Sequence, residues 1–128
     1  MNIEHIALNV DEPEAMAAWY GEHLGFRVLR KVGGEAQIHF IIDDADRVVL
    51  EVYCHPNSPR TDFHDLHPQQ LHVAFAVDDL EGEKQRFLDA GATLAVDVHA
   101  MPTGDLMVFL RDPWGLTLQL AKRIKPLR

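Results

Sequence analysis

Four polar side chains interrupt apolar, strand-like segments at positions that repeat within the sequence. His5 precedes IALNV and His72 precedes VAFAV, while Glu51 lies within VLEV and Gln119 within TLQL. Two imidazoles, one carboxylate and one amide oxygen suit a divalent first-row metal ion such as zinc, nickel, manganese or iron. The sequence therefore predicts a site for one such ion at His5, Glu51, His72 and Gln119, provided that the fold brings these positions together.

An internal repeat explains how four distant positions could meet. The same spacing separates His5 from His72 and Asp11 from Asp78, and it lengthens by one residue towards the end of the second copy. Two copies of this length are too few and too long for a solenoid, so the repeat indicates a duplication within one domain. If the two modules pack about a pseudo-twofold axis, equivalent positions converge.

The first copy reads as strand, helix and three further strands. Residues 3–10 alternate between apolar and polar positions, as a half-buried strand does. Asp11 with Glu14 has the spacing of a capping box, and Gly25 is placed to end the helix that follows. Further strands are expected at residues 26–32, 36–42 and 47–54.

The second copy predicts the same order of elements. A strand is expected at residues 71–77, followed by a helix that Asp78 caps and that ends at Gly91. Three more strands are expected at residues 92–98, 106–111 and 116–122. The prediction is a single domain, residues 1–128, with module one at 1–54, a linker at 55–69, module two at 70–122 and a basic tail at 123–128.

Composition narrows the class of protein. Of the 128 residues 47% are hydrophobic and 25% charged, which is typical of a globular domain. The net charge of −8 argues against nucleic acid or an anionic membrane surface as a partner. A single cysteine, Cys54, and the lack of a recognisable signal peptide or membrane-length apolar run favour a cytoplasmic protein. A small molecule is the expected ligand.

Several segments resemble one known superfamily. They are HIALNV at the start, WYGEHLGF at residues 19–26, LHVAFAVDD at 71–79 and FLRDPWGLTLQL at 109–120. With these, the chain resembles the vicinal oxygen chelate superfamily, which includes glyoxalase I, methylmalonyl-CoA epimerase, extradiol dioxygenases, and fosfomycin- and bleomycin-resistance proteins. The resemblance implies an α+β fold in which two tandem βαβββ modules form a curved, cup-shaped mixed sheet with helices on the outer face.

The resemblance also implies a metal site on the concave face. Its ligands come from the first and last strands of each module, which here carry His5, Glu51, His72 and Gln119. Glyoxalase I-like enzymes usually carry glutamate where this chain has Gln119. Glu51 is thus the only carboxylate of the set.

Three functions remain open at this point. The first is a metal-dependent lyase or isomerase of the glyoxalase or epimerase type, in which the ion holds two vicinal substrate oxygens, an enediolate forms, and Glu51 is ligand and catalytic base. The second is a non-haem Fe(II) extradiol-type dioxygenase with His5, His72 and Glu51 as its facial triad. The third is a metal-free protein that binds a drug, as bleomycin- and fosfomycin-resistance proteins do.

Further candidates are positioned less directly. By strand parity His39 and Tyr53 are expected on the face of Glu51, where they could contact substrate. Arg111 alternates with apolar residues and could hold an anionic substrate. A homodimer is expected, because exposed sheet edges invite pairing between modules or chains.

Overall fold

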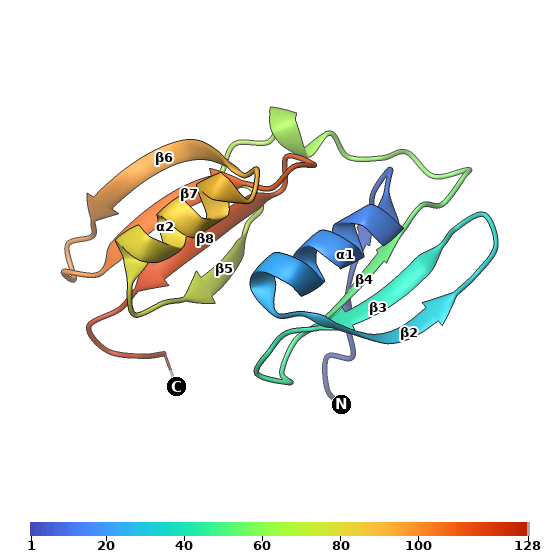
Figure 1. Cartoon of the computed structure of the whole chain (residues 1–128), viewed down its shortest axis with the longest axis horizontal. Coiled ribbons are helices and arrows are strands. Elements are labelled where there is room, and N and C mark those ends of the chain that lie inside the picture. Colours follow the sequence, from blue (N-terminus) through green and yellow to red (C-terminus); the bar gives the residue numbers. More distant parts are fainter. Residues whose placement is uncertain (128) are drawn as a thin grey trace. The chain divides into compact units, whose positions relative to one another are not determined.

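The computed structural model describes residues 1–127 and divides into two compact units, Met1–Thr61 and Asp62–Arg128. Each unit contains one α-helix and one four-stranded sheet (Figure 1). Arg128, the last residue of the predicted tail, lies outside the described residues. None of the helices described for this chain has the length and apolar character needed to cross a membrane.

The first unit folds as β-α-β-β-β, as the sequence predicts. Its elements in chain order are β1 (Ile6–Asn9), α1 (Pro13–Leu24), β2 (Arg27–Val32), β3 (Ile38–Ile42) and β4 (Val49–Tyr53). The strands lie in the order β1-β4-β3-β2. β1 runs parallel to β4, whereas the other neighbours are antiparallel.

The core of this unit lies between α1 and one face of the sheet. Ile41, Leu50 and Val52 are at most 1% exposed, and the helix buries Met16 and Tyr20 completely. Removing each large apolar side chain from water contributes roughly 1.5–3 kcal/mol. Because side chains alternate along a strand, the residues between these core positions point to the opposite face of the sheet. That opposite face carries the candidate site.

The second unit repeats the order after a short 3₁₀ helix. Its elements are η1 (Phe63–Asp65), β5 (Val73–Ala76), α2 (Leu80–Asp89), β6 (Thr93–Ala100), β7 (Leu106–Arg111) and β8 (Thr117–Lys122). The strand order is β5-β8-β7-β6, and β5 runs parallel to β8. The predicted α+β class with two tandem βαβββ modules is therefore confirmed. The strands form two mixed sheets, one in each unit, where a single curved sheet was expected.

The start of α1 differs from the prediction. The helix begins at Pro13, and within residues 1–127 no side chain caps its N-terminus. The capping box of Asp11 and Glu14 is therefore wrong. Proline suits the first helical position because its ring fixes φ and it has no amide proton to satisfy. Asp11 lies outside the helix, where its Oδ1 is 2.8 Å from Nε of Arg60.

The start of α2 lies one residue later than predicted. Asp79, not Asp78, is the capping residue, and its Oδ1 accepts a hydrogen bond of 3.1 Å from the amide of Gly82. A Cβ atom at Gly82 would lie 2.2 Å from Oδ2 of Asp79. Glycine therefore permits the carboxylate to approach the helix closely.

The segments predicted as linker and tail are both bonded to a module. Asn9 accepts a hydrogen bond of 2.9 Å from the amide of His55 and donates to the carbonyl of Pro59 at 3.3 Å. At the other end, Asp105 accepts a bond of 2.9 Å from the amide of Ile124. That hydrogen bond is the main reason why the pKa of Asp105 lies below its usual value. The tail therefore starts from a fixed point.

Candidate functional site

In module one, the imidazole of His5 lies beside the carboxylate of Glu51. Nε2 of His5 is 3.1 Å from Oε2 of Glu51. The histidine ring also meets the ring of Phe40 edge-on, with centroids 5.5 Å apart. Phe40 pairs with Glu51 across β3 and β4, so the two side chains share the face opposite α1. The predicted pair is thus brought together within this unit.

Module two contains the same arrangement with an amide in place of the carboxylate. His72 meets Phe109 edge-on with ring centroids again 5.5 Å apart. Phe109 pairs with Gln119 across β7 and β8, as Phe40 pairs with Glu51. Ala74 of β5 lies opposite Gln119, two residues after His72. The four predicted metal ligands therefore occupy equivalent positions in the two modules.

The hydrogen bonds of the two histidines favour free Nε2 atoms. Nδ1 of His72 is 3.0 Å from the carbonyl oxygen of Pro68, which can only accept, so Nδ1 carries the proton. Nδ1 of His5 contacts the carboxylate of Glu4 in the same way. Such partners orient metal-binding histidines and leave Nε2 with its lone pair.

The contact between His5 and Glu51 tests whether these residues fit a metal ion. With its proton on Nδ1, His5 presents a lone pair to a carboxylate oxygen at 3.1 Å, so two acceptors face each other. A cation between them, either a proton or a metal ion, removes this conflict. The donors therefore fit a divalent ion. Within residues 1–127, no group of three or more His, Cys, Asp or Glu side chains is positioned to hold one.

The predicted substrate contacts lie in different environments. Tyr53 is half-buried and shares its face of the sheet with Glu51, as expected from strand parity. His39 instead pairs with Val52 and Lys31, so it lies on the face covered by α1, and its expected placement beside Glu51 was wrong. It is only 5% exposed, its Nδ1 lies 2.7 Å from the carbonyl of Gln37, and its Nε2 has no hydrogen-bond partner among the described residues.

Arg111 ties the backbone of module two together. Its Nη1 donates to the carbonyls of Phe63 and Gly115 at 2.8 and 2.9 Å, and its Nη2 donates to the carbonyl of Leu66 at 2.7 Å. These carbonyls accept hydrogen bonds from the guanidinium that was expected to hold an anionic substrate. These bonds give Arg111 a structural role in this unit, and its binding of an anionic substrate stays a prediction.

Sequence reasoning missed the two aromatic rings that support the histidines. The sequence did not show where the strands of Phe40 and Phe109 begin, so alternation could not assign either ring to a face of its sheet. Both are apolar, as ordinary core residues are. The available signal was the repeat itself, because IHFII and LMVFLR place phenylalanine at matching positions on the third strand of each module.

The fold and these side chains define a class of protein with two βαβββ modules and a histidine directly before the first strand of each. A family model described as the Glyoxalase/Bleomycin resistance protein/Dioxygenase superfamily matches residues 2–120. The chain therefore belongs to that superfamily, which confirms the resemblance seen in its sequence. None of the curated proteins matches the chain.

Solved structures agree with this assignment. A glyoxalase family protein from Enterococcus faecalis is 27% identical, with a TM-score of 0.71 over 94% of this chain and 97% of that one. A lactoylglutathione lyase from Agrobacterium tumefaciens is 26% identical, with a TM-score of 0.67 over 94% and 92%. A glyoxalase family protein from Bacillus cereus is 16% identical, with a TM-score of 0.78 over 98% and 95%, and shows the fold alone.

Proposed function

We propose that the protein is a divalent-metal-dependent lyase or isomerase of the glyoxalase or epimerase type. Its substrate would be a small molecule with two neighbouring oxygens. The observation that carries the proposal is the repeated arrangement of histidine, phenylalanine and an oxygen donor in both modules. His5, Glu51, His72 and Gln119 would hold the ion.

The proposed roles follow from the chemistry of the four side chains. When bound, the ion would supply positive charge that stabilises an enediolate on the two substrate oxygens. Glu51 would accept the proton from substrate, since an amide such as Gln119 has no usable basicity. One carboxylate and three neutral groups would leave a divalent site with net positive charge, which favours an anion in the transition state.

Metal content tests this proposal directly. Protein reconstituted with Zn²⁺, Ni²⁺, Mn²⁺ or Fe²⁺ should hold about one ion per site, measured by elemental analysis after desalting. His5→Ala and His72→Ala should each remove most of the affinity, because each deletes one imidazole ligand. His99→Ala is the matched control: His99 stacks on Phe109 at 6.0 Å between centroids but is not a proposed ligand.

The outcomes separate the three functional classes. Full metal occupancy in the His5→Ala, His72→Ala double variant would refute the ligand set. Iron with oxygen uptake on a catechol would favour the dioxygenase, and failure to bind any of the four ions would favour a drug-binding protein. One similar structure is named a lactoylglutathione lyase, so S-lactoylglutathione is assayed as a comparison substrate.

We also propose a homodimer. β2 lies at the edge of the first sheet, and its Val28 and Val32 are 42% and 44% exposed. Apolar side chains on an open strand edge favour association with another chain. Light scattering at micromolar concentration should give twice the chain mass, and a monomeric mass would contradict the dimer.

A further inference from the structure

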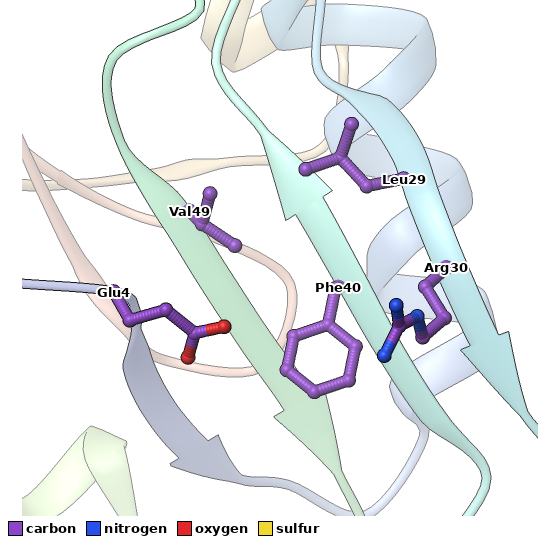
Figure 2. Close-up of a pocket in the computed structure, with 5 residues that line it drawn as sticks. All are labelled: Glu4, Leu29, Arg30, Phe40 and Val49. Atoms are coloured by element: carbon purple, nitrogen blue, oxygen red, sulfur yellow. The ribbon is translucent and has the colours of Figure 1, made fainter.

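A pocket of 290 Å³ opens on the sheet of module one, on the same face as His5 and Glu51. It is lined by Glu4, Leu29, Arg30, Phe40 and Val49. Figure 2 shows Phe40 in the centre, with Glu4 on one side and Arg30 on the other. Ligand pockets usually measure about 300–1,000 Å³, so this one suits a small molecule.

The pocket is continuous with the half-site described above. Phe40 contacts the ring of His5, and Glu4 contacts its Nδ1. Across the strands, Arg30 lies opposite Phe40, and Phe40 lies opposite Glu51. Neighbouring strands are about 4.8 Å apart, so Arg30 and Glu51 stand roughly 10 Å from each other along this row.

A β-bulge directs two neighbouring side chains of β2 into the pocket. The register between β2 and β3 shifts between Val28 and Arg30. An extra residue in one strand re-aims the side chains beside it. Leu29 and Arg30 can therefore both line the pocket, although consecutive residues of a regular strand point to opposite faces.

Arg30 presents positive charge that no carboxylate neutralises. The other basic side chains of β2 are paired: Arg27 with Asp46 at 2.6 Å, and Lys31 with Glu14 at 3.6 Å. For Arg30, no ion pair occurs with any residue from 1 to 127. The guanidinium lies beside an apolar wall, and its planar donors match a carboxylate.

Module two shows that the fold does not require this charge. Val96 lies opposite Phe109 as Arg30 lies opposite Phe40, and a register shift between Leu94 and Val96 repeats the bulge. Leu71 precedes His72 as Glu4 precedes His5. The same framework is thus built with apolar residues in one module and charged residues in the other, so the charges of module one call for a functional explanation.

We propose that the Arg30 pocket binds a carboxylate at the far end of the substrate from its two neighbouring oxygens. The inference rests on the proposed function, because the oxygens would lie at His5 and Glu51. Leu29, Phe40 and Val49 contact an apolar body between the two polar ends. Glu4 repels a second anionic group. The substrate class is therefore a small monocarboxylate with an apolar or aromatic centre.

Binding of a matched pair of probes tests this inference. The probes are 3,4-dihydroxybenzoate and its neutral counterpart 3,4-dihydroxybenzamide, which differ only at the end meant for Arg30. Calorimetry on metal-free protein should give a dissociation constant about tenfold lower for the acid than for the amide, as one charge-assisted pair at an exposed site allows. In an NMR titration, amide shifts should concentrate at residues 29–31 and 40.

Two variants of β2 separate the pocket from net charge. Arg30→Gln should abolish the preference for the acid, whereas Lys31→Gln, which removes the same charge from the other face of the strand, should retain it. Equal affinity for acid and amide in wild type, or an unchanged preference in Arg30→Gln, would overturn the inference. Added Zn²⁺ should tighten both probes; if it does not while the preference for the acid persists, the proposed function fails and the pocket stands.

Discussion

Glu51→Gln is expected to reduce turnover by about 10²–10⁴-fold, the usual contribution of a general base. The carboxylate lies 3.1 Å from Nε2 of His5 and is the only one among the four proposed ligands. The replacement keeps an amide oxygen for the metal but removes the group that can accept a proton. Steady-state kinetics and elemental analysis of the same sample measure both effects.

The matched control is Gln119→Glu, which changes the equivalent position of module two in the opposite direction. It should tighten metal binding, because a second carboxylate adds negative charge to the site. The turnover of Gln119→Glu shows whether a carboxylate in module two changes the rate of catalysis. If Glu51→Gln turned over substrate at the wild-type rate, the base would lie elsewhere and the proposed mechanism would be wrong.

Arg111→Met should lower the free energy of unfolding of the protein by about 3 kcal/mol. Three carbonyls, of Phe63, Leu66 and Gly115, would lose a charged donor at once. Hydrogen bonds to charged groups each contribute about 1.5–3 kcal/mol, and partial exposure of the side chain reduces the sum. Urea denaturation followed by circular dichroism gives the value.

Two further substitutions isolate the geometry of Arg111 from its charge. Arg111→Lys keeps the charge but cannot reach three carbonyls with a planar fork, so it should recover less than half of the loss. Lys122→Met, at an exposed position of β8 in the same unit, should change stability by less than about 0.5 kcal/mol. Equal losses in Arg111→Met and Lys122→Met would show that the carbonyl contacts contribute nothing.

The order of elements could be predicted because the sequence contains an internal repeat, in which both copies have the same pattern. Alternation and the spacing of matched residues located both modules, and glycine at residue 25, with φ of +72°, ended α1 as expected. The beginnings of the helices were less predictable. Asp11 and Asp78 both looked like caps, but a neighbouring proline in one case and a second aspartate in the other moved the start.

Residues of the candidate site differed in how far sequence could place them. Glu51 and Gln119 lie inside strands whose apolar neighbours fix their face, so parity was sufficient. His39 follows a turn in which Gln37 has φ of +46°. The face on which His39 lies is decided by the pairing of β3 with β4, and not by the distance of His39 from the turn. The partners of Arg111 are backbone carbonyls, which carry no signal in the sequence.

The parallel pairing of β1 with β4 governs the order in which the protein can fold during synthesis. Ile6 lies opposite Leu50, so the first strand has no partner until the last strand of its module has left the ribosome. Closing such a long loop costs chain entropy before any pairing energy is gained. The hairpin of β2 and β3 can form earlier and offers α1 a surface. β5 pairs with β8 in the same way, so the sheet of each module can be completed only after the last strand of that module has been synthesised. The sheet of module one can therefore form before the strands of module two have been synthesised.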